Sequence, residues 1–205
     1  MAITTYEEEV QLRILTGREV GKLIGRMGIS KLAAVSVSNL ICNVLSSSAI
    51  AAFTERGGVA YNFIVEPDKN DREIAERVAK FNPDAILLLY GGELPVEDLK
   101  RSLKSFLRAL AETNLKAKLF FHVRAFLAGA VEHSLKDEVV RRYLEENELY
   151  VYTADLDRGI MLMNKINVDG EKLNLIPMLY SSLSFEHTSL LNRSLAGRDV
   201  TFSKK

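Results

Sequence analysis

The sequence predicts a mixed α/β fold, and two observations carry that prediction. Apolar residues recur with period two in some segments and with a period of about 3.6 in others, as they do in strands and in helices. The chain of 205 residues is 47% hydrophobic and 26% charged, which is typical of a globular protein and excludes a disordered one.

Short apolar runs along the chain indicate strands, because they are rich in β-branched and aromatic residues. These runs are Val10 to Leu15, Leu40 to Leu45, Val59 to Val65, Ala85 to Leu89, Lys118 to Val123 and Leu149 to Thr153. Near the C-terminus, Gly159 to Ile166 and Lys172 to Tyr180 are expected to form a hairpin, since Asp169-Gly170 suits a tight turn. Pro177 cannot donate a backbone hydrogen bond, so the second of these strands is expected at a sheet edge.

Three segments have the apolar stripe of an amphipathic helix. The clearest begins after Pro95 and runs from Val96 to Leu110, with its basic residues off the apolar stripe. Asp71 to Phe81 is the second, and a helix capped by Ser134 is the third. These helices alternate with the predicted strands, as expected for α/β structure.

The N-terminal segment contains a glycine pattern with glycines at 17, 21, 25 and 28. The spacing matches neither a phosphate-binding P-loop nor a dinucleotide-binding fingerprint. A predicted strand followed by Val20-Gly21-x-x-Ile24-Gly25-Arg26-Met27-Gly28 resembles the KH domain, most closely the type I modules of poly(C)-binding proteins. The resemblance implies the order β-α-α-β-β-α over residues 8–82, with a helix from Ile29 to Val35 and a strand from Leu40 to Leu45.

The resemblance also implies a function for this unit. In KH domains a Gly-x-x-Gly loop clamps the backbone of single-stranded RNA or DNA, and here that loop would be Gly25 to Gly28. The nucleic-acid-binding residues that it implies are Arg18, Lys22, Ile24, Gly25, Arg26, Met27, Gly28 and Lys31. The expected function is non-catalytic binding of single-stranded nucleic acid, with no cofactor and no metal.

Under this interpretation the chain has three parts. The KH-like domain at 8–82 is followed by an α/β domain at 83–180, which would mediate assembly as a homo-oligomer or with a protein partner. Residues 181–205 are polar and lack a strong period, so they are expected to form a C-terminal tail.

A second interpretation places residues 10–155 in one continuous, Rossmann-like wound α/β domain. Glycines four residues apart then allow a helix to pack closely on its neighbour, Lys31 to Ser38 is a strand, and Leu40 to Arg56 is its following helix. Ligands of such folds lie beyond the carboxyl ends of the parallel strands. This alternative predicts an enzyme or small-ligand-binding protein with a site among Glu93, His122, Arg124 and Asp155.

Charge and cysteine content limit the other function classes. Lys plus Arg and Asp plus Glu number 27 each, so no global field attracts nucleic acid or an anionic membrane. The uncharged run Leu32 to Phe53 is rich in Ser and Asn, which favours buried structure over a membrane span. Cys42 is the one cysteine, and with three scattered histidines it shows no zinc-ligand spacing. Residues 1–9 lack the basic region of a signal peptide, so the expected location is the cytoplasm.

Overall fold

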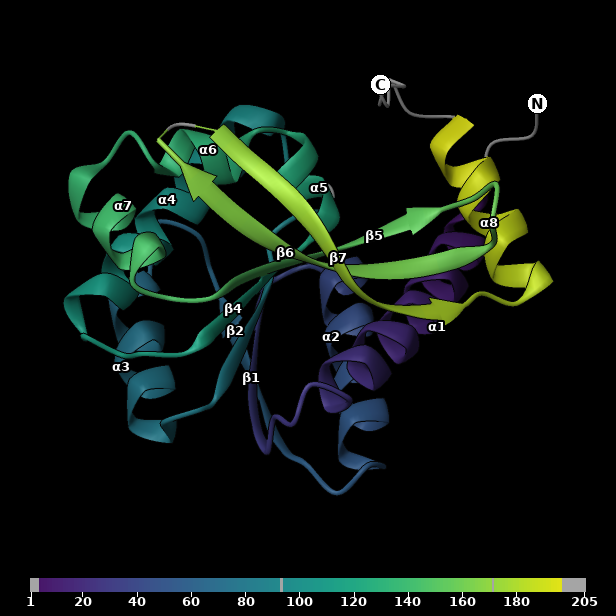
Figure 1. Ribbon diagram of the computed structural model, residues 1–205, viewed down its shortest axis with the longest axis horizontal. Coiled ribbons are helices and arrows are strands. Elements are labelled where there is room, and N and C mark those ends of the chain that lie inside the picture. Colours follow the sequence, from purple (N-terminus) through teal and green to yellow (C-terminus); the bar gives the residue numbers. More distant parts are fainter. Residues whose placement is uncertain (1–3, 93, 171, 197–205) are drawn as a thin grey trace.

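A seven-stranded sheet forms the centre of the computed structural model, which describes residues 4–92, 94–170 and 172–196 (Figure 1). The strand order is β2-β1-β3-β4-β5-β6-β7, in which the first five strands are parallel and the β5–β6 and β6–β7 pairings are antiparallel. The strands are β1 (Lys31–Val37), β2 (Val59–Val65), β3 (Ala85–Leu89), β4 (Lys118–Phe121), β5 (Leu149–Asp155), β6 (Ile160–Asp169) and β7 (Lys172–Ser182). The mixed α/β fold class predicted from periodicity is confirmed.

Helices cover both faces of the sheet, and each face has its own apolar core. One core is built against α1 (Tyr6–Gly25) and α2 (Leu40–Thr54). The other is built against α3 (Asp71–Phe81), α4 (Val96–Glu112), α6 (Ala130–Ser134) and α7 (Glu138–Glu145). A parallel sheet covered on both faces explains why every residue of β3 is buried.

The glycine-rich segment is a single long helix, so the strand predicted from Val10 to Leu15 is wrong. Thr5 and Glu8 form a capping box at the start of α1, which continues to Gly25. A Cβ at Gly17 would lie 2.4 Å from the carbonyl oxygen of Leu45, and one at Gly21 would lie 2.1 Å from that of Ala49. These glycines therefore allow α1 to pack backbone-to-backbone against α2, as the wound-domain interpretation expected.

The segment that follows overturns the KH-like order. KH topology requires a helix from Ile29 to Val35 and a strand from Leu40 to Leu45, whereas residues 31–37 are strand β1 and residues 40–54 are helix α2. The Asn39 side chain accepts a hydrogen bond from the Cys42 N–H and so begins α2. The continuous wound α/β interpretation is confirmed, and the KH-like unit is not present.

The domain boundary expected after residue 82 is also wrong, because the sheet runs through it. β1 pairs with β2 on one side and with β3 on the other, so residues on both sides of the boundary share one sheet. The carboxylate of Asp84 accepts hydrogen bonds from the N–H groups of Ser30 and Lys31, at 3.0 and 2.9 Å. Residues 8–82 and 83–180 therefore form one folding unit.

The C-terminal predictions have mixed outcomes. The β6–β7 hairpin is confirmed, and β7 with Pro177 lies at a sheet edge. The expected tail instead begins with the end of β7 and continues as α8 (Phe185–Ala196), while residues 197–205 lie outside the described residues. The helix expected to be capped by Ser134 is capped by Asp137. No helix in the described ranges is long and apolar enough to span a membrane, and the cytoplasmic location stays a prediction.

Helix α8 packs on α1 through mainly polar contacts (Figure 1). Arg193 pairs with Glu8 at 2.7 Å, and the hydroxyl of Ser194 donates to Glu9 at 2.6 Å. His187 is buried, with Nε2 3.0 Å from Oγ1 of Thr16. Burial lowers the pKa of His187 from 6.5 to about 4, although the carboxylate of Glu19 acts in the opposite direction.

This buried histidine makes stability depend on pH. A folded-state pKa of about 4, below the unfolded value of 6.5, means that its contribution is complete above pH 6.5 and is lost as the pH falls towards 4. In H187Q, whose side chain does not titrate, the acid-induced fall in the free energy of unfolding should be smaller, by on the order of 2 kcal/mol. Urea unfolding across this pH range measures the difference, and parallel curves for the two proteins would contradict the assignment.

Candidate ligand-binding site

The strand order creates a topological switch point between β1 and β3. The chain leaves β1 through α2 towards β2 on one side, whereas β3 lies on the other side of β1. The loops that follow β1 and β3 therefore diverge at the carboxyl edge of the sheet, where open α/β folds bind their ligands. This edge is the candidate site.

The loop after β1 supplies the N-terminus of α2. The Asn39 Oδ1 atom accepts a hydrogen bond of 2.8 Å from the Cys42 N–H, which fixes the first turn of the helix. The positive end of the helix dipole and the other N–H groups of this turn are thereby held at the carboxyl edge.

The loop after β3 lies close to its neighbours because it contains two consecutive glycines. A Cβ at Gly91 would lie 2.8 Å from Nδ1 of His122. Gly92 has a φ of +61°, and a Cβ there would lie 3.1 Å from Sγ of Cys42 and 3.2 Å from the Asn39 amide. Only glycine allows the backbone to lie this close to the ends of β1 and β4.

The loop after β4 carries His122 and Arg124. Nδ1 of His122 accepts a hydrogen bond of 3.0 Å from the Arg124 N–H, which caps the short helix α5 (Val123–Leu127). The guanidinium group of Arg124 donates to the carbonyl of Gly92 and, at 2.8 Å, to that of Leu94. Arg124 therefore ties the β4 loop to the β3 loop.

Three buried side chains complete the cluster. Arg13 of α1 is 9% exposed and pairs with Glu9 at 2.9 Å. Tyr152 of β5 is buried, and its ring lies edge-on to His122 with centroids 5.6 Å apart. Burial raises the pKa of the Cys42 thiol, and the amide of Asn39 and the guanidinium groups of Arg13 and Arg124 oppose that rise. Burial likewise raises the pKa of Tyr152, against the effect of Arg13.

This arrangement can hold an anionic group. The guanidinium group of Arg124 is held at Gly92, and Gly92 lies against Asn39 and Cys42 at the N-terminus of α2; a guanidinium group and a helix N-terminus each favour negative charge. The Cys42 thiol is buried with a raised pKa, so it is unsuited to act as a nucleophile. The described residues contain no group of three or more His, Cys, Asp or Glu side chains that could hold a metal ion.

Of the site predicted for a wound domain, the structure brings two members together. His122 and Arg124 lie side by side at the switch point. Asp155 uses its carboxylate within its own turn, where Oδ1 accepts a hydrogen bond of 3.1 Å from the Arg158 N–H. Glu93 lies outside the described residues.

The nucleic-acid site implied by the KH resemblance does not form. Gly25 ends α1, and residues 26–28 only turn the chain towards β1, so no loop connects two short helices. The predicted contacts have other surroundings.

Ile24 is fully buried, and Lys22 pairs with Glu19. Arg26 donates a hydrogen bond to the carbonyl of Tyr180. The Lys31 ammonium lies over the Phe81 ring. Arg18 is exposed, Met27 packs against the α1–α2 core, and Gly28 has a φ of +70° in the turn. These residues therefore do not share a binding surface.

Arg13, Cys42 and Tyr152 were missed as site residues. The signal for Arg13 is a charged residue on the same helical face as Thr16 and Val20, which are buried, and it becomes visible only once the segment is treated as a helix. Cys42 lies at the start of α2, and its place in the site becomes visible only once residues 40–54 are treated as a helix.

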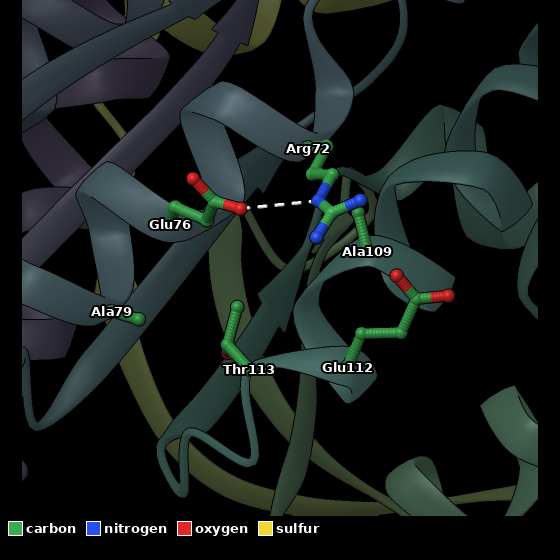
Figure 2. Close-up of a pocket in the computed structure, with 6 residues that line it drawn as sticks. All are labelled: Arg72, Glu76, Ala79, Ala109, Glu112 and Thr113. Carbon is green, nitrogen blue, oxygen red and sulfur yellow. Dashed lines mark hydrogen bonds and ion pairs between the residues drawn. The ribbon is translucent and has the colours of Figure 1, made fainter.

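A shallow hollow of about 240 Å³ elsewhere on the surface is a weaker candidate (Figure 2). It lies between α3 and α4 and is lined by small and charged side chains, among them Ala79, Ala109 and Glu112. Figure 2 shows its arginine, Arg72, paired with Glu76, and both side chains of this pair are largely exposed. An exposed ion pair of this kind contributes little binding energy.

Comparisons with known sequences identify a family and a relative of this chain. A protein family described as "Uncharacterized protein" matches residues 9–190. A protein from Aquifex aeolicus (strain VF5), described in the same words, is 26% identical over 143 residues, which are 69% of this chain and 66% of that protein.

Solved structures with a similar fold are ligand-binding proteins. The solute-binding protein of an ABC transporter from Rhodopseudomonas palustris BisB5, in complex with 3,4-dihydroxybenzoic acid, has a TM-score of 0.52 and 13% identity over 85% of this chain and 66% of that one. Another from R. palustris, in complex with 4-hydroxybenzoate, has a TM-score of 0.50 and 10% identity over 83% and 65%. An extracellular ligand-binding receptor from Rhodopseudomonas palustris has a TM-score of 0.50 and 12% identity, and covers 67% of this chain but 36% of that one.

At these identities the likeness concerns the fold, and the chain spans about one third to two thirds of these proteins. These are solute-binding and ligand-binding proteins, not RNA-binding proteins. Together with the helix and strand order described above, they correct the expectation of a KH domain with a single-stranded nucleic-acid partner.

Proposed function

We propose that this chain, which belongs to the family matched over residues 9–190, is a ligand-binding protein. Its ligand is a small carboxylate, which binds at the switch point between β1 and β3. The observation that supports this most strongly is the convergence of Arg124, Gly92 and the N-terminus of α2: Arg124 donates to the Gly92 carbonyl, and Gly92 lies against Asn39 and Cys42. All three come from different parts of the chain, and only the fold brings them together.

The electrostatics of the site favour an anion. A guanidinium group binds a carboxylate through two parallel hydrogen bonds, and the amide groups at a helix N-terminus bind anions through the helix dipole. Arg124 is already oriented by the carbonyl oxygens of Gly92 and Leu94, so little side-chain entropy is lost when a ligand binds.

The glycine pair also shapes the site. Because Gly91 and Gly92 have no side chains, the backbone of the β3 loop packs directly against His122, Asn39 and Cys42, which brings the loops of the site together. The His122 and Tyr152 rings pack edge-on beside these loops and give the site an apolar aromatic lining.

Two proteins of similar fold fit this ligand class. Both Rhodopseudomonas palustris solute-binding proteins are in complex with hydroxylated benzoates, which are aromatic carboxylates. Their low identity to this chain shows a common fold alone, so the assignment of a carboxylate rests on the residues of the switch point.

Binding of benzoate, compared with benzamide, tests the proposal. The two molecules have nearly the same shape, but only benzoate is charged, so benzoate should raise the melting temperature and benzamide should not. In R124M the affinity for benzoate should fall about 10- to 100-fold, as expected for loss of a charge-assisted pair. Calorimetric titration gives the affinities.

R141M is the matched control for this test. Arg141 also donates to a backbone carbonyl, that of Leu135 at 2.8 Å, but it lies on α7. R141M should therefore bind benzoate as the unmodified chain does. The proposal would be overturned if benzamide stabilised the protein as strongly as benzoate, or if R124M and R141M bound benzoate equally.

A further inference from the structure

We propose that the outer edge of β2, together with the aromatic hollow beside it, binds an extended acidic peptide. This surface is separate from the switch-point site and does not depend on the ligand proposed there. The proposal rests on three features: an unprotected sheet edge, an apolar hollow and a rim of cations.

The two edges of the sheet differ in how they are protected. On β7 the edge contains Pro177, and its pairing with β6 has an irregularity at Met163/Asn164, two features that discourage further strand pairing. On β2 the pairing with β1 is regular from Val59 to Val65, and the strand contains no proline. The β2 edge is therefore the one suited to accept another strand.

Exposed apolar side chains mark the same edge. Val59, Tyr61 and Ile64 of β2 are 59%, 50% and 46% exposed. Sheet edges usually carry charged residues that prevent pairing, and these three residues do the opposite. Pairing with an extended peptide would cover them and satisfy the outward-facing backbone groups of β2.

An aromatic hollow of about 320 Å³ lies between β2 and α3. The rings of Tyr61, Phe63 and Phe81 line it, with centroid distances of 4.8, 5.9 and 6.1 Å between them. A peptide strand directs alternate side chains to one face, so one large apolar side chain would reach this hollow.

Cations surround the hollow, and they determine the charge of the partner. Lys80 and Arg77 line it, Arg77 lies 5.9 Å from the Phe63 ring centroid, and Nζ of Lys31 lies 4.4 Å from that of Phe81. Glu73 lies 3.6 Å from Arg77, whereas Lys31 and Lys80 have no ion pair within the described part of the chain. An acidic peptide would complement these charges.

The same cations argue against a second copy of the chain as the partner. In a twofold arrangement of two β2 edges, the lysines and arginines of one copy would face those of the other. Like charges brought together at an interface cost several kcal/mol, on the order of the whole gain from pairing a short strand.

Selection from a displayed library of random peptides tests this inference with the full chain. Peptides that bind should be enriched in Asp and Glu on either side of a large apolar residue. For a selected peptide, measured by fluorescence anisotropy, K80E should weaken binding at least about tenfold, because it replaces an attractive charge by a repulsive one. Binding should also weaken as salt is raised.

R72E is the matched control, since Arg72 lies on the same helix, is exposed and does not line the hollow. It makes the same charge change and should leave peptide binding within about twofold of the unmodified chain, as expected for a charge outside the contact. The inference would be overturned if no peptide were selected, if the selected peptides were not acidic, or if K80E and R72E had equal effects. A dimer in sedimentation that Y61E disrupts would assign the edge to a second copy instead, because Tyr61 is one of the exposed apolar residues of β2.

Discussion

G21A is expected to destabilise the protein by about 1–3 kcal/mol, the usual cost of forcing extra volume into a packed interface. The new methyl carbon would lie 2.1 Å from the carbonyl oxygen of Ala49, which is backbone and cannot rotate away, so α1 must move off α2. Alanine is otherwise preferred to glycine within a helix by about 1 kcal/mol, so a loss of stability isolates the packing effect. Urea unfolding followed by circular dichroism measures it.

G25A is the control on the same helix. A Cβ at Gly25 would first meet Cδ of Arg56 at 3.0 Å, and a long exposed side chain can move aside. G25A should therefore be close to neutral. Equal stability of G21A and G25A would show that the glycines of α1 are not needed for its contact with α2.

A fragment of residues 1–82 is expected not to fold. It keeps β1 and β2 but loses β3, which pairs with β1 from Leu32↔Ala85 to Ser36↔Leu89. It also loses α4, whose buried side chains cover one face of the sheet. A sheet cut through its centre exposes a strand edge and both apolar faces, so the fragment should aggregate or remain molten.

A proton–nitrogen NMR spectrum of the fragment shows directly whether it is folded. A collapsed and broadened amide spectrum, beside a well-dispersed spectrum of the full chain, is the expected result. Dispersed signals from residues 1–82 alone would show an independent N-terminal domain and would contradict the single sheet.

Elements with a strong amphipathic period were predictable from local sequence. Helix α3 was predicted over residues 71–81 and is observed there, and α4 was predicted within two residues of its end. The Asp169-Gly170 turn likewise identified the β6–β7 hairpin. In each case the residues that predict the element lie within the element itself.

Local sequence alone did not decide between strand and helix for α1 and α2, for a physical reason. The KH-like interpretation placed a strand from Leu40 to Leu45, whereas the wound-domain interpretation placed a helix from Leu40 to Arg56, close to the observed α2. Short apolar runs such as residues 10–15 and 40–45 fit a strand as well as a helix, because both periods match over so few positions. The choice is made by the contact of Gly17 and Gly21 with Leu45 and Ala49, which are distant in sequence. A glycine pattern that serves helix packing then resembles one that serves a nucleic-acid loop.

The candidate site, like the helices, was only partly predictable from local sequence. His122 and Arg124 were found because they follow a recognisable strand, and residues after parallel strands meet at one edge. Arg13 was missed because its segment was predicted as a strand of another fold, and Cys42 because the start of α2 was placed within a strand.

NMR mapping of benzoate binding on the full chain tests the central claim most directly. Addition of benzoate is predicted to shift the amide signals of Gly91, Gly92 and Arg124, which surround the switch point, and to leave those of Arg72 and Thr113 in the α3–α4 hollow unchanged. Shifts confined to the α3–α4 hollow, or no shifts at millimolar benzoate, the weak end of small-ligand affinity, would contradict a carboxylate site at the switch point.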